Sequence, residues 1–409
     1  MKTAFALSAA ILAITATAAD AQRRPQQAPA AQPGARQFNL SKEARPAIAA
    51  LQTAVQARDA AAYAAALPTA QAAAKSADER YVVAQLQLQY AQAGTDRAAQ
   101  LAALENVLAT GGVLPADVPK YHRAIGEIAF ETGKFDRSAQ AFDELARLQP
   151  NDSDVLSNLS IVRSRQGRDA DALSALDRAV AARQAAGQPI PEDWRKRTLA
   201  LATKLKNNPL ALRANYDLVA ANPTPANWSD ALQNHQYLVP LDEGAELDRL
   251  RLMRAAGALK GERAYRYFAE LLLARGLAGE AKAVLDEGVR ANQVSTAKPE
   301  YAALVRQATT RAASARSTLA SAETGATTAR QLQGLGDAYL GVGDYAKAAG
   351  FFRRALAAGG GDTNLLNTRL GIALAYAGDK PGAQTAFDAV TGPRADLARY
   401  WRLWSERRA

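Results

Sequence analysis

One helical pattern occurs twice between Gln331 and Val390, at an offset of 35 residues. This repetition constrains the fold more than any other feature of the sequence. Small residues recur where two helices must approach closely, and large apolar residues recur where they fill the space between helices. The first copy contains Leu335, Gly336, Tyr339, Gly343, Tyr345, Ala348, Phe352 and Ala355, and the second contains Leu370, Gly371, Leu374, Gly378, Ala383 and Phe387. Because one such hairpin cannot bury its own apolar faces, several must stack.

Further copies of the same pattern occur earlier in the chain. They contain Ile125, Gly126, Gly133, Ala139, Phe142 and Pro150, then Leu156, Leu159, Ser160, Gly167, Ala172 and Leu176, and then Tyr265, Phe268, Ala269, Gly276, Ala281 and Leu285. The glycine that follows each first helix suits a left-handed residue that closes the turn.

These residues resemble the signature of the tetratricopeptide repeat family, W-x2-L-G-x2-Y followed by A-x3-F and P. The resemblance implies an all-α fold, a right-handed α-solenoid of stacked helix-turn-helix repeats. We expect a signal peptide at 1–21, a Pro/Gln/Ala-rich flexible linker at 22–37, degenerate helical hairpins at 38–112, repeats at 113–183, irregular helical repeats at 184–260, repeats at 261–391 and a C-terminal capping helix at 392–409. We expect the irregular stretch to change the curvature and not to form a separate domain. The alternative for the last helix is an exposed helix that docks a partner.

The first 21 residues predict export. Lys2 precedes an apolar run, and Ala19-Asp20-Ala21 offers a small-x-small cleavage site. A membrane anchor is the alternative, but the run is shorter than the ~20 apolar residues that a spanning helix needs. We therefore expect a periplasmic protein, or one on the periplasmic side of the outer membrane, with no transmembrane segment after cleavage. The linker carries arginines and no acid, which suits a solubilising spacer or contact with an anionic membrane surface.

The amino-acid composition restricts the kinds of functional site and partner that the chain can have. The chain contains no cysteine, which excludes disulfides, thiol nucleophiles and thiolate metal sites. The formal net charge of +10 favours an acidic protein, an anionic polysaccharide or an anionic lipid over nucleic acid as the partner of an exported chain. Charges that are merely solvated along helix faces are the alternative explanation.

No catalytic, cofactor-binding or metal-ligating site is expected. His122 and His235 stand on separate segments without a second histidine at helical spacing, and we expect His122 to be a packed core residue. The run Gly341-Val342-Gly343 follows a helix, whereas a dinucleotide-binding motif must follow a strand. The run Gly359–Asp362 suits a helix stop followed by an N-cap.

The family resemblance implies that the first helix of each repeat lines a concave groove and points residues near the glycine position inward. Those positions are Lys120, Arg123, Glu127, Asn158, Ile161, Arg165, Arg263, Arg266, Glu270, Arg330, Gln333, Asp337, Leu340, Arg369, Ile372 and Tyr376. Each of these repeats supplies an arginine, which suits an acidic or C-terminal peptide. Glu127 replaces the asparagine of the family's carboxylate clamp, and it is alternatively an i, i+4 partner of Arg123.

The favoured function is a non-enzymatic periplasmic scaffold that holds a protein or peptide partner in the groove, in cell-envelope assembly or polysaccharide export. The alternative is a direct binder of anionic cell-wall or capsular polysaccharide. An enzyme with a site in 184–260 is a third hypothesis, although no nucleophile, base and orienting group can be named together there.

Overall fold

The computed structural model describes residues 38–408, so the expected signal peptide and linker lie outside the described residues. Over this range the chain is all-α and contains no β-strand, which confirms the predicted fold class. The chain divides between Ile190 and Pro191 into two compact units, called unit 1 and unit 2 below. The division falls inside the stretch 184–260, whose helices belong to unit 2. Of the helices in 38–408, none combines the length and hydrophobicity needed to cross a bilayer.

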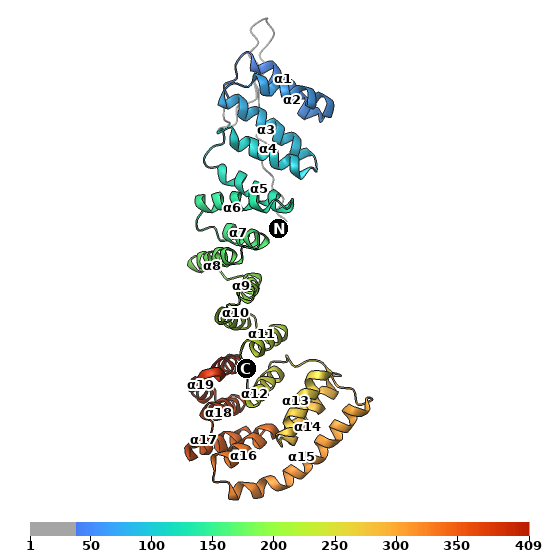
Figure 1. Ribbon diagram of the computed structural model, residues 1–409, viewed down its shortest axis with the longest axis vertical. Coiled ribbons are helices and arrows are strands. Elements are labelled where there is room, and N and C mark those ends of the chain that lie inside the picture. The colour runs from blue at the N-terminus through green and yellow to red at the C-terminus, as the bar shows by residue number, and fades with distance from the viewer. Residues whose placement is uncertain (1–37, 409) are drawn as a thin grey trace, which may run out of the picture. The chain divides into compact units, whose positions relative to one another are not determined.

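Unit 1 is a stack of consecutive helical hairpins (Figure 1). Its helices are α1 (Ala44–Ala57), α2 (Ala60–Ala73), α3 (Ala77–Ala93), α4 (Arg97–Ala109), α5 (Val118–Glu131), α6 (Phe135–Leu148), α7 (Ser153–Arg165) and α8 (Asp169–Ala185). Each helix packs on its successor, because the apolar stripe of one hairpin is buried only by the next hairpin.

Side chains at the helix ends fix where the helices of unit 1 begin. The Ser76 hydroxyl accepts from the backbone N–H of Glu79, and the Glu79 carboxylate accepts from the backbone N–H of Ser76, which forms a capping box at α3. Glu79 also accepts from the backbone N–H of Ser41 at 2.9 Å. Hydrogen bonds from Ser41 and Ser76 lower the pKa of Glu79 to about 2. One buried carboxylate thus ties the start of α1 to the start of α3.

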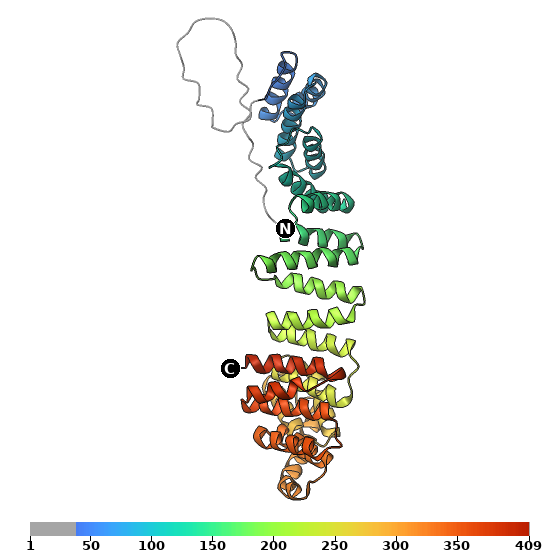
Figure 2. The same cartoon turned by 90° about the vertical axis from the view of Figure 1, so that its left-hand side faces the viewer.

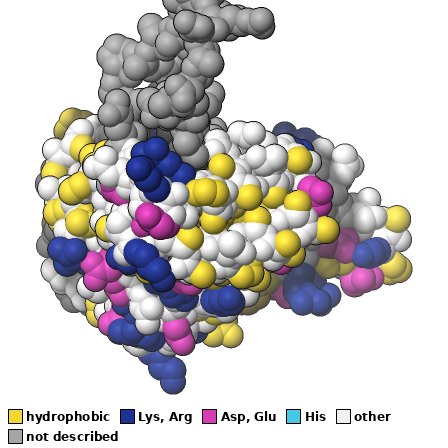
Figure 3. Space-filling view, turned by 90° about the horizontal axis from the view of Figure 1, so that it is seen from above, with side chains coloured by type: hydrophobic (Ala, Val, Ile, Leu, Met, Phe, Trp, Pro, Cys, Tyr) yellow, Lys and Arg dark blue, Asp and Glu magenta, His cyan; other side chains and the backbone are white. Residues whose placement is uncertain are grey.

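The outer helix at the N-terminal end of unit 1 is unusual because α2 contains no charged residue. Its exposed residues include Ala61, Ala62, Ala64 and Ala65. Figure 3 looks onto the upper end of Figure 1, and hydrophobic side chains gather on the face it shows. Helix α2 therefore exposes small, uncharged side chains at this end of unit 1, although end repeats usually carry a polar outer face.

Unit 2 contains further hairpins, one long helix and a returning C-terminus. Its elements are α9 (Glu192–Lys204), α10 (Asn208–Ala221), α11 (Pro225–Leu238), α12 (Glu243–Ala255), α13 (Glu262–Ala274), α14 (Ala278–Arg290), α15 (Pro299–Gly325), α16 (Ala329–Val342), α17 (Tyr345–Ala358), α18 (Thr363–Ala377), α19 (Lys380–Asp388), the 3-10 turn η1 (Gly392–Arg394) and α20 (Ala395–Arg407). At 27 residues, α15 stands where the sequence leads us to expect continuous repeats. No glycine or proline interrupts it between Pro299 and Gly325, so nothing ends the helix earlier.

The C-terminal helix α20 packs on α19 and also returns to α12 (Figure 1, Figure 2). The indole N–H of Trp401 donates to the backbone carbonyl of Asp248, and that of Trp404 donates to the carbonyl of Ala255, both at 3.1 Å. Unit 2 therefore closes on itself through residues about 150 positions apart in sequence.

In three of the hairpins, a glycine of the first helix packs against a phenylalanine ring of the second helix. Gly126, Gly336 and Gly371 each face the phenylalanine sixteen residues later, and a Cβ added there would lie 2.8, 2.6 and 2.5 Å from the ring. Where the later residue is leucine, the first position holds a larger residue. Ser160 corresponds to Leu176, and Ala269 corresponds to Leu285. A phenylalanine at the later position thus requires glycine at the first position, whereas the smaller leucine leaves room for serine or alanine.

Gly371→Ala should destabilise unit 2 by about 1–3 kcal/mol, because the new methyl group overlaps the Phe387 ring. Adding Phe387→Leu should recover part of this loss by recreating the Ala269 and Leu285 combination. The matched control is Gly350→Ala in α17, where a Cβ would meet nothing within 4 Å. The control should be neutral or slightly stabilising. Urea denaturation followed by circular dichroism measures all three variants, and an unaffected Gly371→Ala protein would contradict the close-packing account.

Candidate functional site

In unit 1, two of the three expected charged residues on α5 form ion pairs. The Arg123 guanidinium donates to the carboxylate of Asp152, the N-cap of α7, at 2.8 Å, and Lys120 pairs with Asp117 at 2.7 Å. The alternative pairing of Arg123 with Glu127 is therefore not made, because the next repeat supplies a nearer acid. Glu127 is half-buried, and this burial raises its pKa although Arg123 opposes the shift.

The neighbouring helix α7 carries three of the expected residues in one stripe. Asn158, Ile161 and Arg165 follow the spacing i, i+3, i+7, which places them on one helix face. Asn158 and Ile161 are half-buried, whereas Arg165 is exposed. Among residues 38–408, no acid forms an ion pair with Arg165. This face therefore combines a hydrogen-bonding amide, an apolar side chain and an uncompensated cation.

In unit 2, five expected positions lie on the accessible surface of α13 and α16. The three on α13, Arg263, Arg266 and Glu270, are exposed, and Arg266 pairs with Glu270 at 2.7 Å. On α16, Arg330 is exposed and Gln333 is half-buried.

The remaining expected positions on α16 and α18 are in the interior, with one exception. Asp337 is 5% exposed, Leu340 7%, Arg369 2% and Ile372 0%, so these four are not open groove residues as expected. Tyr376 is half-buried. Asp337 and Arg369 are buried because they pair with Arg251 and Asp248 of α12.

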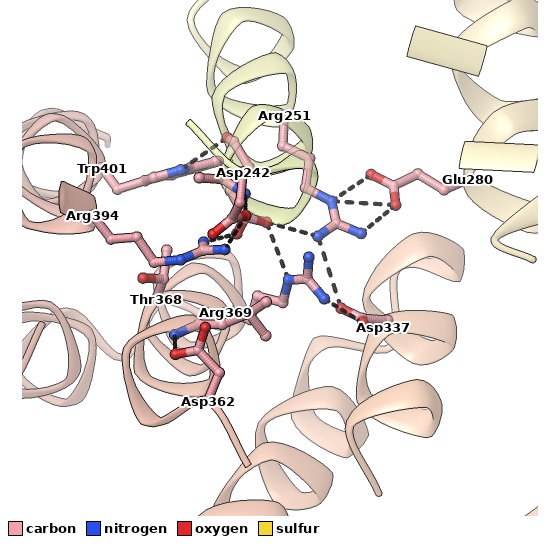
Figure 4. A network of polar contacts seen from close by, with 12 residues as sticks. Asp242, Arg251, Glu280, Asp337, Asp362, Thr368, Arg369, Arg394 and Trp401 are labelled. Carbon is pink, nitrogen blue, oxygen red and sulfur yellow. Dashed lines mark hydrogen bonds and ion pairs between the residues drawn. The ribbon is translucent and has the colours of Figure 1, made fainter. Parts of the chain in front are cut away.

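Asp248 of α12 is the centre of a buried charge network (Figure 4). One carboxylate oxygen accepts from Arg251 at 3.0 Å and from Arg369 at 3.2 Å, and the other accepts from Arg394 at 3.3 Å. Asp248 is 0% exposed. Three arginines from α12, α18 and η1 therefore converge on a single carboxylate.

Two further acids balance the remaining donors. Arg251 forms a two-pronged contact with Glu280 of α14, at 2.9 and 2.6 Å. Arg369 donates to Asp337, which lies 3.8 Å from Arg251. Burial lowers the pKa of Arg251, but Glu280 and Asp248 more than offset this effect and raise it above its usual value. Burial raises the pKa of Asp337 although Arg369 and Arg251 oppose the shift. Three acids and three arginines thus neutralise one another inside unit 2.

A pocket of about 190 Å³ opens beside this network, and Leu340, Ile372 and Tyr376 line it together with Arg254. The Tyr376 ring stacks on Tyr345 with centroids 4.7 Å apart. The Nε of Arg254 donates to Glu287 at 2.7 Å. Three expected inner-wall residues therefore meet at this opening, although two of them are buried.

The histidines and acids do not assemble into a metal centre in the described part of the chain. His235 is 0% exposed and lies edge-on to the Tyr400 ring at 6.0 Å, while His122 is half-buried. Burial lowers the pKa of both histidines.

The network residues Asp248, Arg251, Glu280 and Arg394 are absent from the sequence-based site. The sequence gives one weak indication that this helix is buried. Apolar residues lie on several of its sides, at Leu247, Leu250 and Leu252, which is typical of a helix enclosed by others.

Arg369→Ala should destabilise unit 2 by about 3–5 kcal/mol, because Asp248 and Asp337 would each lose a buried partner. Arg266→Ala, at another position expected in the groove, should cost no more than about 1 kcal/mol because its ion pair is exposed. Chemical denaturation of the two variants measures the difference. Equal losses would show that the network around Asp248 is not the structural centre of unit 2.

Comparison with known proteins agrees with this repeat geometry. Family models described as tetratricopeptide repeat match residues 83–153, 123–189 and 331–366. No curated protein is significantly similar to the chain in sequence.

Similar solved structures are distant. A tetratricopeptide repeat protein from Parabacteroides merdae is 15% identical, with 71% of this chain and 100% of that chain covered and a TM-score of 0.28. The TPR2AB domain of yeast Sti1 in complex with pHSP90 is 13% identical, with 71% and 100% covered and a TM-score of 0.27. The TPR domain of P58(IPK) is 11% identical, with 82% and 89% covered and a TM-score of 0.24.

The matched segments form helical hairpins in the structure. In these hairpins a glycine after the first helix closes the turn at positive φ, as Gly133, Gly167 and Gly343 do. Residues 83–189 and 331–366 therefore carry tetratricopeptide repeats.

Proposed function

We propose that this protein is a non-enzymatic scaffold that binds an acidic segment of a protein partner on the inner face of α5 and α7. The observation that carries the proposal is the stripe Asn158, Ile161 and Arg165. Arg165 offers a planar guanidinium without an ion-pair partner in the described chain, Ile161 offers an apolar contact, and Asn158 offers an amide to a peptide backbone.

The neighbouring helix supports an extended ligand. Arg123 is held in place by Asp152, and its remaining donors lie on the same helix face as half-buried Glu127. A segment with an acidic residue opposite Arg165 and a polar or basic residue opposite Glu127 would satisfy both charges. Burial already raises the pKa of Glu127, so a donor from the partner would be favourable there.

The proposed setting is the bacterial cell envelope. Residues 1–21 direct export in this proposal, and the mature scaffold acts in the periplasm or on the periplasmic side of the outer membrane, in envelope assembly or polysaccharide export. Cell fractionation with N-terminal sequencing of the mature chain tests this location. A cytoplasmic chain that retains Met1 would contradict it.

A second candidate is direct binding of an anionic cell-wall or capsular polysaccharide, which the net charge of +10 favours. Binding driven by charge should weaken steeply as salt rises, because counter-ions screen exposed charges beyond about 8 Å at physiological ionic strength. Glycan binding at two salt concentrations separates this candidate from a peptide ligand held by shape and hydrogen bonds.

Arg165→Glu should abolish capture of the native partner, because reversing the charge places two acids against each other. The matched control is Arg178→Glu on α8, since Arg178 is also exposed and without an ion pair among residues 38–408. A photo-crosslinking residue at Ile161 traps the partner in living cells, and mass spectrometry identifies it. We expect a loss of affinity of about tenfold or more for Arg165→Glu and little change for the control. Equal capture of the partner by both variants would contradict binding at this face of α7.

A further inference from the structure

The imidazole of His235 on α11 is fully buried and makes no hydrogen bond. Within the part of the chain that the structure describes, neither of its ring nitrogens has a partner. The hydroxyl of Tyr400 on α20 and the amide nitrogen of Asn215 on α10 are also buried there without a partner. A neutral imidazole carries one donor and one acceptor, and this site satisfies neither. Such groups are rare in protein interiors, and each one calls for an explanation.

The Tyr400 ring joins α20 to the helix pair α10–α11. Its centroid lies 5.6 Å from the ring of Tyr216, 6.0 Å from that of Trp228 and 6.0 Å from that of His235. The imidazole meets the Tyr400 ring edge-on, at an interplanar angle of 87°. His235 therefore lies within the aromatic contact that attaches α10–α11 to α20.

Helix α20 is held separately on its other side. The indole N–H groups of Trp401 and Trp404 donate to backbone carbonyls of α12, and α20 also packs on α18 and α19. These bonds between indoles and backbone carbonyls do not titrate near neutral pH. Loss of the contacts around Tyr400 would therefore leave α20 in place on α12, α18 and α19. The connection 239–242 between α11 and α12 would then act as a hinge for α10–α11.

The charged groups around His235 already have partners of opposite charge. On α20, the carboxylate of Asp396 lies 3.6 Å from the guanidinium of Arg399. On α12, Arg249 pairs with the buried carboxylate of Glu246 at 2.6 Å. Burial lowers the pKa of His235, Asp396 opposes this shift, and Arg249 adds to it. A protonated ring would have to compete for a carboxylate that already lies beside a cation.

The remaining ionisable groups at this contact provide no compensating charge. Burial raises the pKa of the Tyr400 hydroxyl, and Asp396 adds to this shift. Tyr216 and Asp217 of α10 act in the same direction. The Tyr400 hydroxyl therefore stays neutral at physiological pH. It offers no negative charge to a protonated His235.

Acid favours separation of the two surfaces. A solvated imidazole has a pKa of about 6.5, whereas the packed ring of His235 has a lower pKa. Between these two values the separated arrangement binds more protons than the packed one. Each fall of one pH unit in this window raises the ratio of separated to packed molecules by up to about tenfold. Above pH 6.5 the ring is neutral in both arrangements, and the ratio does not depend on it.

We propose that His235 is a pH switch, in which a proton from solvent charges the buried ring and separates the helix pair α10–α11 from α20. Helix α20 stays on α12, α18 and α19, so the change is a movement of one helix pair and not an unfolding of unit 2. This proposal does not depend on the one made for unit 1, since it concerns other residues and holds for any partner.

The test measures single-molecule fluorescence energy transfer in the full chain, which contains no native cysteine. Dyes at Asn208→Cys on α10 and Gln384→Cys on α19 report the separation, and dyes at Gln307→Cys on α15 and Gln384→Cys provide the reference. All three positions are exposed. Between pH 7.5 and pH 5.5 we expect the separated fraction to rise by about threefold to tenfold for the first pair. The reference pair should not change.

His235→Phe keeps an aromatic ring against Tyr400 but cannot take up a proton, so its separated fraction should not depend on pH. The matched control is His122→Phe in unit 1, which should respond as the unaltered protein does. Circular dichroism establishes that each variant is folded, and His235→Gln replaces His235→Phe if the latter does not fold. An unaltered protein without a pH response, or a folded His235 variant with the full response, overturns the proposal. An equal change in the reference pair would show general acid unfolding and would also overturn it.

Discussion

The convergence of three arginines on the Asp248 carboxylate is the interaction on which unit 2 depends. Asp248 belongs to α12, whereas Arg369 and Arg394 belong to segments more than 120 residues later in the chain. A buried carboxylate is unstable without such partners, and buried arginines are equally unstable without acids. Each group thus requires the others, which specifies how the last repeats close around α12.

The hairpins themselves depend on a simpler constraint. Gly336 and Gly371 give up a side chain so that a phenylalanine ring can lie against the helix backbone, and Ser160 or Ala269 suffices where the opposing residue is leucine. This local complementarity builds both units from the same element. The units differ in what the first helices contact: in unit 2, α12 packs on α18 and places Arg251 beside Asp337 of α16, whereas in unit 1 the Arg165 side chain of α7 is exposed.

The sequence predicts the hairpins well because their determinants are local. Gly343 ends α16 with a φ of 85°, and Asp362 caps α18 through its side chain, as the pattern of glycines and aspartates indicates. It does not predict that Arg369 is buried, because the partner Asp248 lies 121 residues away and nothing in a single sequence marks the two as neighbours. Spacing within a repeat identifies an inner-wall position, but only the tertiary fold decides whether solvent or another helix occupies the wall.

Thiol labelling gives the most direct test that the chain's own helix fills this wall, since the native sequence contains no cysteine. The two variants are Leu365→Cys, at a residue that contacts the start of α12, and Ile161→Cys, on the half-buried face of α7. With α12 in place, the thiol at 365 should react roughly a hundredfold more slowly than the thiol at 161, because labelling requires local opening. Equal rates in the two folded proteins would contradict a wall occupied by α12.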